Sequence, residues 1–360
     1  MKVNKKILVL LIMSLFLVFV LIGCANNANE GGAEVNEGSP EGETEGGAEK
    51  AADDNWPTGP IRVILPAAAG GSLDVGVRQM QPFFEEILGV PFIVDPRPGG
   101  QNILAATLLA ESEPDGYTIG NFGFPHTEMS FVMMDTDLTL EDFDCLGIHE
   151  NDVGVLRVHD EGRFQTFEEL LDFAIANPGE VSISVSQLIG PHTFYLLQLE
   201  EAVGAKFNII DFGGGNPART ALLGKHVDVC CTNINASMPI DEGTKVIVVT
   251  HNENKWPELT DNAPTHNEVL QEKYGVTLPD MGVNYGLLAP AGFKEKYPER
   301  FEKLTKAYED VINNPEYLEM LKEAQQDMKV TWMNHEEMTN FVKENYEMYS
   351  KNKHLFETLY

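Results

Sequence analysis

Three short loops of small residues are the segments of this 360-residue chain best suited to binding chemistry. They read "AAAGGSLD" at 67–74, "SQLIGPHT" at 186–193 and "FGGGNPAR" at 212–219. Each follows an apolar run typical of a strand and precedes a helical pattern, so each presents the unpaired N–H groups of a helix start. Gly70 and Gly71 leave those N–H groups open to a ligand because they carry no Cβ. The three loops together predict a site that holds an anion through backbone N–H groups.

A single loop of this kind makes a weak site. One helix start stabilises an anion by only about 0.3–1 kcal/mol, so a useful site needs several. Each loop also fits an ordinary tight turn, and the sequence leaves that alternative open for each of them. Pro217, at the expected first turn of a helix, supports the strand-to-helix interpretation of the third loop.

The elements that must position these loops are strands alternating with helices from Trp56 onward. Short apolar runs predict the strands, which read "IRVILP", "VPFIVD", "YTIGNFGF", "EVSISVS", "KFNIID", "VDVCCTNI" and "TKVIVVT". Helical patterns follow most of them, and the stretches 297–326 and 334–352 predict amphipathic helices. This order predicts an α/β fold with mixed, mostly parallel sheets, in which a ligand binds at the carboxyl ends of strands.

The net charge and the motifs that the chain lacks exclude several classes of function. A formal charge of −31 argues against nucleic acid as a partner, because phosphate binding needs clusters of Lys and Arg. The simplest reason for this acidity is solubility, and a small anionic ligand stays compatible with it, since backbone dipoles act at short range. The sequence has no Gly-x-Ser-x-Gly, His-Glu-x-x-His or Gly-x-Gly-x-x-Gly motif and no metal-ligand spacing of Cys and His. We therefore expect a binding protein with no cofactor and no metal; an extracellular hydrolase is the alternative.

The N-terminal segment predicts export and lipid anchoring. Residues 1–24 combine a basic start, an apolar run and "LIGC", which resembles a bacterial lipobox that ends at a lipidated Cys24. A plain transmembrane anchor is the alternative, and either one places the rest of the chain outside the cytoplasm. Residues 25–55 are rich in Gly, Glu, Asn and Ala and predict a disordered acidic tether. The sequence thus predicts an extracytoplasmic protein, lipid-anchored to the outer face of the cell membrane.

Three further cysteines and five scattered histidines are expected to have no chemical role. We interpret the cysteines as buried free thiols, because adjacent cysteines rarely bond to each other; a bridge from the first to one of the later two is the alternative. These cysteines are Cys145, Cys230 and Cys231. The histidines are expected in loops or at strand ends, where solvent surrounds them. They are His149, His159, His226, His251 and His266.

The order of motifs along about 56–345 resembles one known family. The chain opens with "WPTGPIRVILPAAAGGSLD" and continues with "VDPRPGGQNILAA" and "PDGYTIG". Later come "IDFGGGNPARTALLGKHVD", "APTHNEV" and "YGLLAPAG". This series is similar to the extracytoplasmic solute-binding proteins of tripartite tricarboxylate transporters, the Bordetella-uptake-gene type of receptor.

The resemblance implies a binding protein without catalysis and with a two-lobed, periplasmic-binding-protein-like (type II) fold. The lobes are expected at 56–157 plus 284–360 and at 158–283, joined by a hinge. They close over a small carboxylate, and a monomer delivers it to the membrane subunits of a tripartite tricarboxylate-type transporter. A sensor that presents the ligand to a membrane signalling partner is the alternative, which the sequence does not separate from transport.

The resemblance also implies which residues contact the ligand. They come from the three loops and from the ends of two strands, and they are Ala69, Gly70, Gly71, Ser72, Asp74, Phe124, His126, Ser186, Gln187, Gly190, His192, Thr193, Gly213, Gly214, Gly215, Asn216 and Asn233. His192 lies one position before the usual histidine of the family, and a solvent-facing helix start is its alternative role. Asp74 is expected to cap or orient a helix start, with contact to an amino group of the ligand as the alternative.

Overall fold

The computed structural model describes residues 55–234 and 243–359. The predicted signal peptide at 1–24, with Cys24, and the predicted tether as far as residue 54 lie outside the described residues. Within the two described ranges, no helix is long and apolar enough to cross a membrane. All of these residues fall in one of the two compact units of the chain, Asp53–Tyr360.

Three parallel strands and one antiparallel strand form the first part of the sheet. Ile61–Leu65 (β1) lies between Phe92–Pro96 (β2) and Thr118–Phe124 (β3) and runs parallel to both. β3 then pairs with the antiparallel strand Gly282–Pro290 (β9). Parallel neighbours need crossover connections, which usually contain a helix. The helices of these crossovers are Ser72–Leu88 (α2) and Ile103–Ala110 (α3).

A second set of parallel strands repeats the pattern. Val181–Val185 (β5) lies between Phe207–Asp211 (β6) and Val229–Asn233 (β7) and runs parallel to both. The helices around these strands are Phe167–Ala176 (α5), Pro191–Val203 (α6), Gly215–Leu223 (α7) and His266–Tyr274 (α8). Each of the two sets therefore has the strand-to-helix turns that the sequence predicts.

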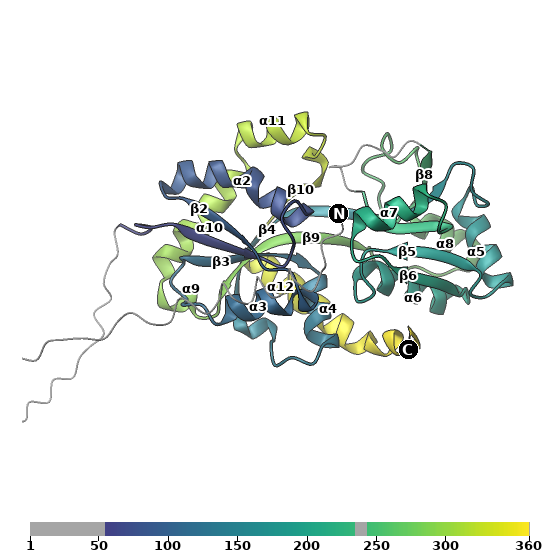
Figure 1. The fold of residues 1–360 in the computed structure, drawn as a ribbon, viewed down its shortest axis with the longest axis horizontal. Helices are drawn as coiled ribbons and strands as arrows, with labels where there is room; N and C mark the ends of the chain where they lie inside the picture. The colour runs from purple at the N-terminus through teal and green to yellow at the C-terminus, as the bar shows by residue number, and fades with distance from the viewer. Residues whose placement is uncertain (1–54, 235–242, 360) are drawn as a thin grey trace, which may run out of the picture. The chain divides into compact units, whose positions relative to one another are not determined.

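One long strand, Phe143–His159 (β4), joins the two sets (Figure 1). Its first part pairs with β9 and with Val330–Asn334 (β10), and its last part pairs with β7 and with Thr244–Val249 (β8). All pairings of β4 are antiparallel, and the main strand order is β2-β1-β3-β9-β4-β7-β5-β6. The α/β fold with a mixed sheet is confirmed, whereas the long strand β4 and its partner β9 were not predicted.

The remaining helices pack around the first set of strands. They are Gly100–Asn102 (η1), His126–Met133 (α4), Leu140–Asp142 (η2), Phe293–Lys296 (α9), Pro298–Ile312 (α10), Pro315–Glu323 (α11), Asp327–Lys329 (η3), His335–Asn352 (α12) and Lys353–Leu359 (η4). α10 contacts α2, and α12 contacts both β4 and α4. The last element, η4, also contacts α6 of the second set.

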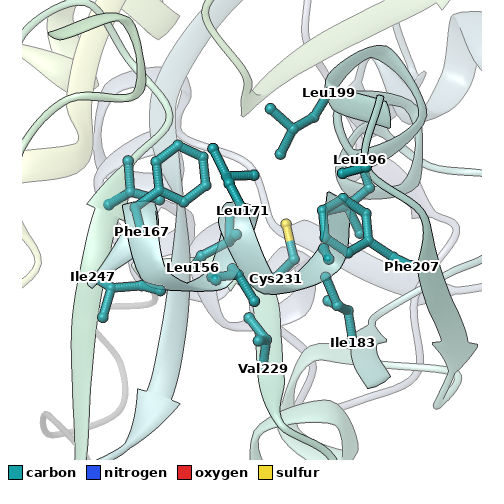
Figure 2. Packing of buried hydrophobic residues seen from close by; sticks show 14 of the residues in the cluster. Leu156, Phe167, Leu171, Ile183, Leu196, Leu199, Phe207, Val229, Cys231 and Ile247 are labelled. Atoms are coloured by element: carbon teal, nitrogen blue, oxygen red, sulfur yellow. The ribbon is translucent and has the colours of Figure 1, made fainter. Parts of the chain in front are cut away.

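Separate hydrophobic cores stabilise the two sets of strands. Figure 2 shows the core of the second set, where Ile183 and Val229 meet Leu196 of α6 and Phe167 of α5. Cys231 is buried in the same core. Another core packs β1 and β2 against α2 and α10. Because each set buries its own apolar side chains, each gives its loops a rigid base.

The cysteines and two histidines test the sequence predictions directly. The three cysteines at positions 145, 230 and 231 are free thiols, as predicted, and no bridge joins them; Cys230 and Cys231 are buried, but Cys145 is only half-buried, so the prediction that all three are buried is wrong for Cys145. The solvent-facing role expected for His149 and His266 is wrong, because both side chains are buried. His149 Nδ1 hydrogen-bonds the Tyr308 hydroxyl at 2.5 Å, and Tyr308 lies 159 positions further along the chain. Such a distant partner leaves no local signal in the sequence.

Candidate functional site

The three small-residue loops converge on one cavity of about 560 Å³. The loops follow β1, β5 and β6, and the segments that end or follow β2, β3 and β7 also line it. The carboxyl ends of parallel strands thus meet at one place, as expected for this class of fold. The predicted residues that line the cavity are Gly70, Gly71, His126, Ser186, Gln187, His192, Gly213, Gly214, Gly215, Asn216 and Asn233.

Other predicted residues lie beside the cavity without lining it. They are Ala69, Asp74, Phe124, Gly190 and Thr193, whereas the side chain of the predicted Ser72 lies outside what the structure describes. Phe124 is fully buried and packs in the core beneath β3. Gly190 is the N-cap residue of α6, and Thr193 Oγ1 donates to the Gln187 carbonyl at 3.0 Å. These contacts shape the second loop from behind.

Asp74 holds the first loop in place. Its Oδ2 accepts a hydrogen bond from the Gly70 N–H at 2.9 Å and another from Arg78 Nε at 2.9 Å. The bond from Arg78 lowers the pKa of the buried Asp74 carboxyl, so the carboxylate persists at neutral pH. Gly70 has a φ of +82°, a conformation that favours glycine. The orienting role expected for Asp74 therefore has a physical basis in the bond to Gly70.

Asp211 ties the second loop to the third. Its Oδ2 accepts from the Leu188 N–H at 3.2 Å, and its Oδ1 accepts from the Gly213 N–H at 2.7 Å. Gly213 has a φ of +68°, and Gly214 is the N-cap residue of α7. No side chain caps the start of α7, so its first N–H groups stay open toward the cavity that the loop lines.

Two neutral histidines line the cavity from the starts of α4 and α6. Burial lowers the pKa of His126 to about 3 and the pKa of His192 to about 4, so neither ring is cationic at physiological pH. His192 Nε2 donates to Asn233 Oδ1 at 2.8 Å, because an amide oxygen only accepts. The solvent-facing alternative for His192 is wrong, since its side chain is only 3% exposed.

Two buried charged residues at the cavity were missed by the sequence analysis. Asp152 comes from β4 and Arg219 from α7, and both line the cavity. Burial raises the pKa of Asp152 well above its usual range, and the nearby Glu150 carboxylate adds to the shift. Lys329, Arg219 and Asn233 oppose it. Arg219 lies in the third loop motif, so the sequence offered a signal for it. Asp152 lies in β4, which was not predicted, so no sequence pattern indicated its place at the cavity.

A fourth loop and one tyrosine also line the cavity, and the sequence analysis assigned neither of them to the site. Gln101 and Asn102 follow β2 and have φ angles of +51° and +74°. Their segment, "RPGGQN", belongs to one of the motifs that resemble the receptor family, and that motif could have indicated their place at the site. Tyr285 of β9 lines the cavity as well.

Metal-ligand groups and a second cavity are the other features of the described residues that bear on the site. Within 55–234 and 243–359, no group of three or more His, Cys, Asp or Glu side chains is placed to hold a metal ion. A larger cavity of about 670 Å³ lies between the start of β4 and α12, away from the loops. Lys294 and Lys343 belong to its lining, but no residue of the three loops does. The loop cavity is therefore the better candidate site.

Comparisons with known proteins agree with this architecture. Residues 77–359 match the model of a family described as the tripartite tricarboxylate transporter family receptor. A protein from the gbd 5′ region of Cupriavidus necator is 28% identical over 301 residues, which cover 82% of this chain and 86% of the relative.

Two solved structures show the same fold. Periplasmic binding protein BugD has a TM-score of 0.69 at 22% identity, covering 84% of this chain and 99% of that protein. MatC from Rhodopseudomonas palustris, solved with bound malate, has a TM-score of 0.69 at 20% identity, covering 82% of this chain and 99% of that protein. The periplasmic-binding-protein-like fold predicted from the sequence is confirmed.

Proposed function

The chain belongs to the tripartite tricarboxylate transporter receptor family, and on that premise we propose that it captures a small carboxylate between two lobes for delivery to a membrane transporter. Receptors of this family bind solutes and are not enzymes. The observation that carries the proposal is the convergence of three helix-start loops on one cavity. MatC, of the same fold, was solved with malate, which supports a carboxylate as the class of ligand.

The loop geometry favours an anion that is held by the main chain. α2 and α7 begin at the cavity without a side-chain cap, so N–H groups of their first turns stay available. α6 also lacks a side-chain cap, but it begins at Pro191, which has no N–H, and it lines the cavity through His192. Each helix start carries about half a positive charge, and N–H bonds to a carboxylate are charge-assisted. The neutral rings of His126 and His192 add donors or acceptors without adding charge. A cavity of about 560 Å³ has the size of a small-molecule site.

Lobe closure is the proposed means of burying the ligand. The expected boundaries near 157 and 283 fall in β4 and at the start of β9, the two strands that join the two sets. Thr250 links these two segments, since its Oγ1 lies 2.8 Å from both the Gly154 and the Met281 carbonyl oxygens and shares its single proton between them. A ligand that touches loops of both lobes favours the closed form by its difference in affinity between the two forms.

Anchoring and delivery complete the proposal. A lipid on Cys24 and the acidic tether at 25–55 hold the receptor at the outer face of the membrane. The closed form docks as a monomer on the membrane subunits of the transporter. A sensor that presents the same ligand to a signalling partner is the second candidate. Loss of uptake of the ligand after deletion of the chain supports transport and contradicts a purely sensory role.

The substitution Gly71→Val tests the loop assignment. A Cβ at Gly71 meets the Ala68 carbonyl oxygen at 3.2 Å, so the valine side chain crowds the loop and the approach to its N–H groups. Native mass spectrometry of the purified receptor identifies the co-purified acid, and calorimetry then measures its affinity. We expect a loss of at least about tenfold, the equivalent of one charge-assisted hydrogen bond. Gly59→Val is the control, because a Cβ there meets nothing within 4 Å. Unchanged affinity in Gly71→Val refutes the assignment.

A further inference from the structure

A small hydrophobic cluster joins three separate parts of the chain without lining the loop cavity. The ring of Phe194 is central to it, with a centroid 4.8 Å from that of Tyr349, edge-on, and 6.0 Å from that of Phe356, stacked. The C-terminal segment, yellow in Figure 1, continues from α12 past α4 and contacts α6. The buried members, which we call the C-terminal cluster, are Met129 of α4, Phe194 and Leu197 of α6, and Tyr349, Leu355 and Phe356 of α12 and η4.

The C-terminal cluster lies directly behind two residues of the cavity wall. His126 is the first residue of α4 and lines the cavity, and Met129 follows one turn later. His192 lies in the first turn of α6 and lines the cavity, and Phe194 follows two positions later, on a different side of the helix. Ile189 of the second loop also packs against the cluster. The cluster therefore supports both helix starts that carry the cavity histidines.

The C-terminal cluster also crosses the proposed boundary between the lobes. α4, α12 and η4 fall in the first expected lobe, and α6 falls in the second. The two helix starts are close together, since a Cβ at Gly190 would lie 3.7 Å from His126 Cδ2. Moving α6 away from α4 would bring Phe194 and Phe356, now 3% and 2% exposed, into water. The cluster therefore favours the form in which α4 and α6 line one cavity.

Resting on the proposed function, we infer that Tyr349 and Phe356 are positioning residues for ligand binding: they hold α4 and α6 together so that both helix starts face the same ligand. Neither side chain lines the loop cavity, so both act through α6. A ligand that binds the form with both helices at the cavity stabilises the cluster by the same free energy with which the cluster favours binding. The affinity of the receptor then depends on a segment outside its binding site.

Hydrogen exchange in the unmodified receptor tests this coupling without a substitution. The probe is the acid that native mass spectrometry identifies in the purified receptor, or malate if no acid co-purifies. Saturation with the probe should slow amide exchange in 349–359, which does not line the loop cavity, at least about threefold. The comparison uses times at which the amides of α10, which report on global unfolding, have not exchanged. Unchanged exchange in 349–359 overturns the inference.

Two leucine variants connect the affinity to the two rings. Phe356→Leu and Tyr349→Leu keep an apolar side chain and remove a ring contact with Phe194. We expect each variant to bind the same probe about threefold to tenfold more weakly, the equivalent of one aromatic pair. Tyr349→Phe keeps the ring and should bind as the parent does. Phe301→Leu is the matched control, because that ring is 2% exposed and packs in the core between α2 and α10.

Affinity and dissociation rate separate positioning from a purely structural role. The loss should appear in the rate at which the probe dissociates, because the rings stabilise the form that encloses it. Calorimetry measures the affinity, and stopped-flow displacement measures the dissociation rate. Far-UV circular dichroism and the melting temperature show whether each variant folds. A structural role alone lowers the melting temperature of all three leucine variants and leaves their affinities equal to that of the parent.

The outcomes also separate this inference from the proposed function. Folded Phe356→Leu and Tyr349→Leu that bind as tightly as the parent overturn the inference and leave carboxylate capture intact. An equal loss of affinity in Phe301→Leu overturns it too, because the effect is then not specific to the C-terminal cluster. If a leucine variant does not fold, the exchange measurement on the unmodified receptor decides. If no organic acid co-purifies and no small carboxylate binds, the proposed function is contradicted, and this inference with it.

Discussion

Glu128 gives the stability of this protein a pH dependence that one substitution should remove. Its side chain is fully buried on α4, and the effect of burial on its carboxyl outweighs the opposing hydrogen bond from the Asn345 side chain. Burial raises the pKa of Glu128 from 4.5 to about 8. Between these values the folded state keeps a proton that the unfolded state releases. The contribution of this group to stability is therefore complete below pH 4.5 and is lost as the pH rises toward 8.

The magnitude follows from the linkage of proton binding to folding. A difference of one bound proton changes the free energy of unfolding by about 1.4 kcal/mol per pH unit. Between pH 5.5 and pH 7.5, the free energy of unfolding of the parent chain should therefore fall by about 2.7 kcal/mol more than that of Glu128→Gln. Glutamine has nearly the same shape and does not titrate in this range, so packing changes little.

Urea unfolding, followed by circular dichroism at several pH values, measures this difference. The stability of the parent minus that of Glu128→Gln should become steadily more negative from pH 5.5 to pH 7.5. Other buried groups titrate in both chains and cancel in the difference. Glu319→Gln, on the surface of α11, is the matched control and should follow the parent at every pH. Parallel curves for the parent and Glu128→Gln would refute the reasoning.

Three further predictions concern packing and thiols. Gly154→Ala places a Cβ 2.5 Å from Thr250 Oγ1, so urea unfolding should show a loss of about 1–3 kcal/mol, with Gly59→Ala unchanged; equal stabilities contradict the close packing of β4. Phe356→Ala removes a buried ring that stacks on Phe194 and should cost about 3–5 kcal/mol; a loss below 1 kcal/mol would show that η4 does not dock on α6. Cys230 and Cys231 should react with Ellman's reagent at pH 8 only after unfolding, because both side chains are buried and burial raises their pKa values; rapid reaction of either one in the native protein contradicts this.

The loops could be predicted from the sequence because their signals are local. Gly70 and Gly213 have positive φ angles, which glycine adopts without strain. Glycines between a strand pattern and a helix pattern therefore indicate such a turn within a few residues of sequence. The strands β1, β3, β5 and β7 are apolar runs of the length expected for buried strands. Patterns that involve a few neighbouring residues therefore identified the elements and the position of the cavity.

β4 could not be predicted because its pattern reflects long-range contacts. Its segment "IHENDVGVLRVH" places Glu150, Asp152 and Arg157 in buried positions, where local patterns predict exposed charge. Lys329, 179 positions beyond Glu150 in the chain, supplies the ion pair that makes this burial tolerable. The position of Asp152 in the cavity wall was missed for the same reason. These charged residues are buried because the fold brings distant residues against them, and a local sequence pattern cannot identify those distant partners.

A crystal structure of the receptor with its co-purified ligand tests the central claim most directly. The account predicts a carboxylate within hydrogen-bond distance of the N–H groups at Gly70–Gly71 and at Gly213–Gly215. It would be contradicted by a ligand whose negative group points away from both loops. A ligand bound only in the cavity between β4 and α12 would contradict it equally.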